Sequence, residues 1–352
     1  MTNRVHDFRF MPTGIGSVPF RDIDATCRKI LEDLPEIPFW PQFVKRSFLE
    51  DMIVQPSEAL PLLKIRENER SLLVSEDNRE SELVTFYERF LAEDIDHFAI
   101  SREYAPGLYT LLELIALQAG HNGGYVKGQS VGPVTFAAGA KDLEGKSLFH
   151  DPELLEAMVK GLSIKALWQV RRLSTSGRKP IIFLDEPYLS GFGSAFSPIE
   201  RHQVIDLLGT VITYLREKSD ALIGIHCCGN TDWAMLLEAG PDIINFDAYE
   251  YMDYFLLYKD DIIRFLEQDG IVAWGIIPTS NSMKNESVED LFAKLKEGLS
   301  RLHQWGVDSE LLAQRSILTP ACGMGTMPPE EAKRGMDLLS RLSKKCRALL
   351  LP

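Results

Sequence analysis

The chain has 352 residues, of which 45% are hydrophobic and 25% are charged, as in a typical globular protein. It has no run of about 18 apolar residues, so we expect no membrane-spanning helix, and its formal net charge of −13 at pH 7 disfavours nonspecific nucleic-acid binding. The N-terminal stretch carries Arg4, Asp7 and Arg9 and lacks the apolar core of a signal peptide, so we expect a cytoplasmic protein.

The N-terminal third has irregular patterning. It predicts strands at residues 10–19, 72–74 and 97–100, and helices at 24–34, 43–53, 81–93 and 107–120. From residue 125 onward, apolar runs bounded by turn residues alternate with amphipathic segments. The predicted strands of this part are 125–132, 180–184, 221–225, 242–246, 271–277 and 315–319. The predicted helices are 152–176, 198–218, 232–239, 258–268, 288–305 and 329–349.

This alternation predicts βαβ units and a parallel sheet. About eight such units over this length favour a (β/α)8 TIM barrel rather than an open sheet. No linker rich in Gly or Ser divides the chain. We therefore expect an α/β protein with a single domain over residues 1–352, a barrel with an N-terminal helical elaboration.

The most informative stretch follows the buried strand predicted at residues 221–225. It reads His226, Cys227, Cys228, and Gly229 and Asn230 then turn the chain. Side chains alternate on a strand, so His226 and Cys228 share one face and Cys227 points away. An imidazole and a thiolate on one face supply half of a tetrahedral zinc site.

Polar residues also follow the other predicted strands, and the carboxyl ends of barrel strands carry the chemistry of this fold. Cys322 comes after the strand at 315–319, in the Gly-rich segment CGMG. With His226 and Cys228 it gives a Cys₂His set whose fourth position is open or filled by a carboxylate, the pattern of a catalytic zinc site. The alternative is two buried cysteines and a hydrogen-bonded histidine, which are common in protein cores.

Acidic residues at the strand ends have two interpretations each. Asp247 and Glu250 are candidates for a fourth metal ligand, and we favour Asp247 because it lies where its strand ends; a solvated acidic loop is the alternative. Asp185 and Glu186 follow the strand at 180–184. They can hold a substrate ammonium or orient other site residues, or they can cap a helix and form an ion pair at the barrel mouth.

Several motifs together resemble a known family. They are residues 13–19 (TGIGSVP), 132–135 (GPVT), 184–187 (LDEP), 226–228 (HCC), 242–247 (DIINFD) and 320–326 (PACGMGT). The chain resembles, almost end to end, the catalytic domain of cobalamin-independent methionine synthase. It is also similar to relatives in the uroporphyrinogen decarboxylase superfamily, including methylcobamide:thiol methyltransferases.

The resemblance implies a (β/α)8 barrel that binds zinc through His226, Cys228 and Cys322, with Asp247 where the methionine synthases carry Glu. It implies that Ile15, Ser17 and Asp185 contact an amino-acid thiol, with Asp185 also acting in catalysis. The family's His-Gly-Glu motif is not evident here. Glu76 or Asp77 lies near its expected place, and Asp77 is our substitute for it among the substrate-binding residues.

The expected function is a zinc-dependent thiol S-methyltransferase, as in methionine biosynthesis. The acceptor is a small thiol such as homocysteine or coenzyme M. The donor is a methyl-corrinoid, free or on a carrier protein, with methyl-folate as second choice. Two alternatives on the same barrel are a decarboxylase of the uroporphyrinogen type and a non-catalytic zinc- or corrinoid-binding protein. Nucleic acid and membranes are not expected partners.

Overall fold

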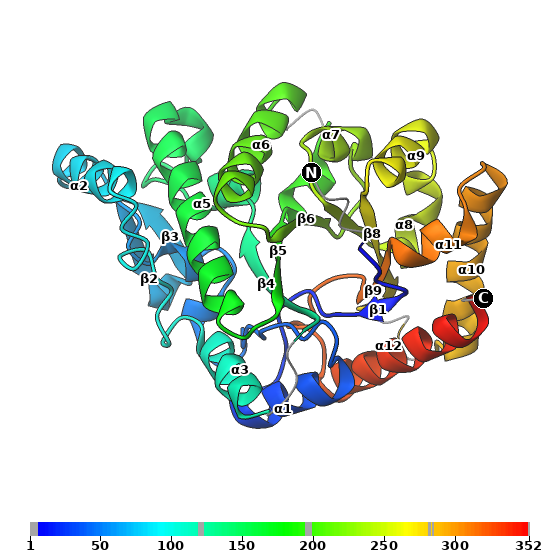
Figure 1. The fold of residues 1–352 in the computed structure, drawn as a ribbon. Helices are drawn as coiled ribbons and strands as arrows, with labels where there is room; N and C mark the ends of the chain where they lie inside the picture. Colours follow the sequence, from blue (N-terminus) through cyan, green and yellow to red (C-terminus); the bar gives the residue numbers. More distant parts are fainter. Residues whose placement is uncertain (1–5, 119–122, 194–198, 281–282, 284, 351–352) are drawn as a thin grey trace.

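The computed structural model describes residues 6–118, 123–193, 199–280, 283 and 285–350. Within these residues, seven parallel strands form one sheet in the order β1-β9-β8-β7-β6-β5-β4. The strands are β1 (Met11–Pro12), β4 (Tyr125–Val131), β5 (Lys179–Asp185), β6 (Leu222–Cys227), β7 (Ile243–Phe246), β8 (Ile271–Ile277) and β9 (Ser316–Pro320). The sheet is curled, and helices lie around its outside (Figure 1).

The predicted alternation of strands and helices from residue 125 onward is confirmed. The helices are α1 (Ile23–Asp33), α2 (Arg79–Leu91), α3 (Pro106–Leu117), α4 (Pro133–Gly139), α5 (Pro152–Ser174), α6 (Arg201–Lys218), α7 (Trp233–Glu238), α8 (Ala248–Phe255), α9 (Lys259–Glu267), α10 (Val288–Gln304), α11 (Ser309–Gln314) and α12 (Pro329–Leu350). Residues 119, 120 and 198 of two predicted helices lie outside the described residues. No described helix combines the length and apolar composition that crossing a membrane requires.

The two faces of the sheet bury different sets of side chains. Alternate strand residues, such as Ile181 and Phe183 of β5 and Leu222 of β6, form a small apolar cluster on the inner face. The residues between them pack outward against the helices. Side chains two residues apart on a strand share a face. Asp185 comes two residues after Phe183, and His226 comes four residues after Leu222. Both side chains therefore lie on the inner face.

The segment 36–42 is hydrogen-bonded both to the edge strand β4 and to residues 16–18, which follow the other edge strand, β1. On the β4 side, Trp40 N–H donates to Lys127 O (3.2 Å) and Lys127 N–H donates to Pro38 O (2.8 Å). On the other side, Gln42 N–H donates to Gly16 O (3.0 Å) and Val18 N–H donates to Gln42 O (2.9 Å). This segment therefore lies between β4 and residues 16–18, and it forms one isolated bridge on each side, Phe39 with Lys127 and Gln42 with Ser17.

Two predicted elements are wrong. Residues 43–53 form turns and a single 3-10 turn (Phe48–Glu50) instead of a helix. The cause is the buried carboxylate of Glu50, which accepts hydrogen bonds from Phe43 N–H (2.8 Å) and Arg46 Nε (2.7 Å) and folds the chain around itself. Residues 97–100 form no strand; their backbone makes turn hydrogen bonds, such as Phe98 N–H to Ile95 O (3.1 Å).

Local elements that the sequence patterns did not predict lie around the sheet. They include α4, α8, α11 and β2 (Leu63–Arg66). β2 pairs antiparallel with β3 (Ser71–Val74), the strand predicted at 72–74. This hairpin lies outside the curled sheet, beside α2 (Figure 1).

Candidate metal centre

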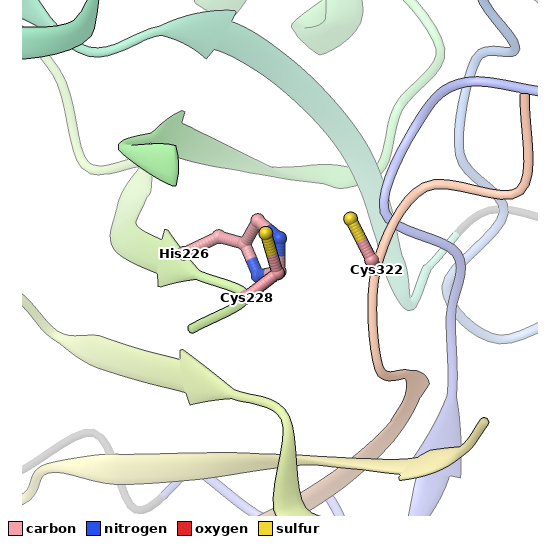
Figure 2. A group of neighbouring side chains, drawn as sticks. All are labelled: His226, Cys228 and Cys322. Atoms are coloured by element: carbon pink, nitrogen blue, oxygen red, sulfur yellow. The ribbon is translucent and has the colours of Figure 1, made fainter. Parts of the chain in front are cut away.

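Three predicted ligands converge at the carboxyl ends of the strands. His226 lies near the end of β6, Cys228 follows that strand, and Cys322 follows β9. Their ligand atoms all lie within 4.8 Å of one another, and no other such group was found among the residues that the structure describes. The side chains approach from two sides, with Cys322 facing His226 and Cys228 (Figure 2). A single ion with metal–sulfur bonds of about 2.3 Å can be shared by such a group.

The sheet register explains why these side chains meet. Asp185 of β5 pairs with His226 of β6, and His226 pairs with Asn245 of β7. Paired residues of parallel neighbours lie side by side on one face. Cys227 belongs instead to the apolar cluster beneath the helices, and its thiol contacts Gly229 O (3.5 Å), which confirms that it faces away from His226.

Asn245 is a site residue that our sequence reasoning missed. Its Oδ1 lies 2.5 Å from His226 Nδ1. Its Nδ2 donates to Ala273 O (2.7 Å) and to Thr319 Oγ1 (2.8 Å). A single amide inside the apolar strand IINF was the available signal, because a buried polar side chain needs partners.

The ligands change one another's pKa values. A hydrogen bond from the Cys322 thiol, together with His226, lowers the pKa of Cys228 to about 4. That same hydrogen bond and burial raise the pKa of Cys322. Burial lowers the pKa of His226, but the hydrogen bond to Cys228 and the charge of Asp185 outweigh it and raise the pKa overall. A bound cation would compete with protons for these three side chains.

Asp185 and Glu186 have separate roles. Glu186 is fully buried and accepts from Val134 N–H (2.9 Å), Thr135 N–H (2.7 Å) and Thr135 Oγ1 (2.6 Å), so it holds the start of α4. Asp185 lies beside His226, and its buried Oδ1 has no hydrogen-bond partner among the described residues. Burial raises the pKa of Asp185 to about 6. The helix-capping interpretation thus applies to Glu186. Asp185 instead keeps one carboxylate oxygen that can accept a hydrogen bond from a ligand.

Lys127 of β4 is a second residue that the sequence analysis did not single out. It is completely buried, and burial lowers its pKa to about 7 although Asp185 opposes the shift. Its Nζ donates to Ile15 O (2.5 Å) and lies 4.4 Å from the centre of the Phe183 ring. Lys127 therefore fixes the backbone at Ile15, one of the predicted substrate-binding residues.

Ser17 packs directly against the loop that carries Cys322. Met324 N–H donates to Ser17 O (2.9 Å), and Gly325 N–H donates to Ser17 Oγ (3.3 Å). A Cβ atom on Gly323 would lie 2.2 Å from Ser17 Oγ, so any larger residue there would displace the Ser17 hydroxyl. The structure thus brings Ile15 and Ser17 to the side of the site where Cys322 lies.

The predicted fourth ligand, Asp247, lies near the group but is not part of it. Its Oδ1 accepts from Glu250 N–H (2.9 Å) and caps the start of α8. Burial raises the pKa of Asp247 to about 6, and Cys228 adds to the shift. Glu250 is exposed. Neither carboxylate belongs to the set of ligand atoms within 4.8 Å, so a carboxylate ligand stays a prediction.

Asp77 and Glu76 are not brought to the site by any contact found in the described residues. Asp77 is exposed in the turn after β3 and pairs with Lys64. Glu76 pairs with Arg79 (3.3 Å). The role of Asp77 in substrate binding also stays a prediction.

The arrangement has the composition of a reactive metal centre. Two sulfur donors and one imidazole leave a fourth position for water or substrate, as in catalytic zinc sites. The buried carboxylate of Asp185 lies beside it, and its Oδ1 has no hydrogen-bond partner among the described residues. Neither a scan against protein-family models nor a search of curated proteins finds a match for this chain.

Proposed function

We propose that the protein is a zinc-dependent methyltransferase that alkylates a small thiol, related to the catalytic domain of cobalamin-independent methionine synthase and to methylcobamide:thiol methyltransferases. The convergence of His226, Cys228 and Cys322 at the strand ends carries this proposal. We also propose that the sheet is a closed (β/α)8 barrel of a cytoplasmic, single-domain protein, in which the segment 36–42 takes the place of an eighth strand. Barrel enzymes of this kind place their chemistry at this end.

In this proposal His226, Cys228 and Cys322 hold the ion and leave one position free for the acceptor. Zinc bound there would supply positive charge that keeps a thiol deprotonated at neutral pH. The acceptor sulfur attacks the methyl group of a methyl-corrinoid, or of methyl-folate as second choice. A carbon–sulfur bond forms, the bond from methyl to its donor breaks with its electron pair leaving on the donor, and the acceptor's proton passes to solvent. The chain's residues orient the two reactants.

The free oxygen of Asp185 favours an acceptor that carries an ammonium group. A substrate cation would pair with a buried carboxylate whose Oδ1 otherwise has no hydrogen-bond partner among the described residues. A thiol that ends in a sulfonate, such as coenzyme M, would instead place an anion near Asp185. We therefore expect an aminothiol such as homocysteine to be preferred. Ile15 and Ser17 would contact the same substrate, beside the loop of Cys322.

The test is metal content followed by X-ray absorption. We expect one zinc per chain with two sulfur neighbours, and a third sulfur neighbour after addition of homocysteine but not of coenzyme M. Cys228→Ser and Cys322→Ser should each lose most metal affinity and methyl transfer from methylcobalamin. Cys227→Ser removes a neighbouring thiol that faces the core and should keep the metal.

Absence of stoichiometric metal would overturn the proposal and favour the decarboxylase. Zinc that gains a third sulfur without any methyl transfer would favour a binding protein.

A further inference from the structure

The contacts around His226 determine which of its nitrogens can serve as a ligand. The imidazole turns one ring nitrogen toward Cys322 (Figure 2). The other, Nδ1, lies 2.5 Å from Asn245 Oδ1. The nitrogen available to the two thiols is therefore Nε2, provided that Asn245 presents an acceptor to Nδ1.

The orientation of the Asn245 amide follows from its other neighbours. The backbone carbonyl oxygen of Ala273 lies 2.7 Å from one end of the Asn245 amide, and this oxygen can only accept a hydrogen bond. That end must be the NH₂, which also reaches Thr319 Oγ1 at 2.8 Å. If the amide were flipped, the Asn245 oxygen would face the Ala273 carbonyl oxygen, and two acceptors would lie against each other. Oδ1 is thus held toward His226, and Nδ1 must carry a hydrogen.

The network is closed to water. His226 is 2% exposed, and Asn245 and Thr319 are fully buried. Because these side chains are out of contact with bulk solvent, replacing the amide by an apolar side chain of similar size leaves a buried N–H unsatisfied. The sheet register supports the same geometry, because Asn245 pairs with His226 on one side and with Ala273 on the other.

We propose that Asn245 is a positioning residue that fixes the Nδ1–H form of His226 and directs Nε2 at the metal shared with Cys228 and Cys322. Hydrogen bonds of this kind to metal-bound histidines fix the ring and strengthen the ligand. The proposal depends on metal binding at this group but not on methyl transfer, so it can fail or hold independently of the proposed reaction.

The first measurement is zinc affinity, by competition with a chromophoric chelator. Asn245→Leu replaces the amide by an apolar side chain of similar size, and we expect zinc to bind about 10–100-fold more weakly. Thr319→Val leaves the Ala273 and His226 contacts of Asn245 in place and should bind within a few-fold of the unaltered protein. Gln169→Leu removes a buried amide from α5 that contacts none of the ligands, and controls for general destabilisation.

The second measurement is nitrogen NMR of the unaltered protein with labelled histidines, with and without zinc. We expect His226 to show a protonated Nδ1 in both states and a metal-bound Nε2 with zinc. A metal-bound Nδ1, or an Asn245→Leu variant that is folded and binds zinc as tightly as the Gln169→Leu control, would overturn the proposal. If the unaltered protein binds no metal, the proposed function fails, and the Nδ1–H prediction is decided by the metal-free spectrum alone.

Discussion

Asp185 lies at the mouth of the sheet with a buried oxygen that has no hydrogen-bond partner in the described part of the chain. Its ionised form is disfavoured there, because burial raises its pKa from 3.8 to about 6. An unfolded chain has no such penalty. Between these two pKa values the native protein binds more protons at this residue than the unfolded chain does, so Asp185 reduces stability as the pH rises.

Replacement by Asn should remove this pH dependence. Relative to the unaltered metal-free protein, Asp185→Asn should gain stability as the pH rises from about 4 to about 6, and the difference should then stay constant. The gain is at most about 3 kcal/mol, at about 1.4 kcal/mol for each unit of pKa. Urea unfolding midpoints of both proteins at several pH values measure it. A difference that does not change between pH 4 and pH 6 would show that Asp185 is solvated in the native state.

The sequence predicted that two thiols and one imidazole would converge, because strand alternation and strand ends are local properties. The contributions of Asn245 and Lys127 depend on partners from other strands: Ala273 and Thr319 for the amide, and Ile15 for the ammonium. No pattern within β7 or β4 contains those partners. A buried polar residue in an apolar strand indicates only that some partner exists.

At the scale of elements, the start of α4 is held by the side chain of Glu186, the residue that follows β5. Glu186 accepts three hydrogen bonds from Val134 and Thr135, and this places the turn at Gly132 against its side chain. A Cβ atom on Gly132 would lie 2.2 Å from Glu186 Oε1. Gly132 has φ −76°, so alanine could adopt its backbone conformation and the conflict is purely steric.

Gly132→Ala should therefore destabilise the protein by about 2–4 kcal/mol, because Glu186 must leave buried donors to make room. Gly191→Ala is the matched control. No atom lies within 4 Å of its new methyl group, so we expect no loss of stability. Urea unfolding compares the two variants, and equal midpoints would mean that Glu186 can move without cost.

The alternation of strands and helices after residue 125 could be predicted because each strand is an apolar run between turn residues. The failures at residues 43–53 and 97–100 have a shared physical origin. In both, a distant or buried charged group organises the backbone: Glu50 binds Phe43 N–H, and the buried Lys165 donates to Phe98 O (3.2 Å). Apolar periodicity does not report such contacts.

At the scale of the molecule, the segment 36–42 decides whether the curled sheet is closed. Pro38 and Pro41 lack an N–H, so this stretch cannot form a full ladder with either neighbour. It still exchanges hydrogen bonds with β4 and with residues 16–18. The apolar patterns of the sequence did not indicate its position between β4 and residues 16–18.

Hydrogen exchange tests the proposed closure. The amides of Trp40, Gln42 and Val18 should exchange as slowly as those of β5 and β6, because opening them requires opening the sheet. The Arg46 amide, bonded only to Phe43 O in a nearby turn (2.8 Å), should exchange faster. Equal and rapid exchange of Trp40, Gln42 and Arg46 would mean that the sheet is open between its edges.

The pairing of β1 with β9 also has a consequence for biosynthesis. Met11 pairs with Ile317, so the first strand of the sheet has no strand partner until most of the chain has left the ribosome. Cys322 leaves the ribosome only a few residues after Ile317, long after His226 and Cys228. Contacts this distant in sequence form late in folding. The nascent chain thus brings His226, Cys228 and Cys322 together only after its sheet strands have been synthesised, so the candidate metal site forms late in folding.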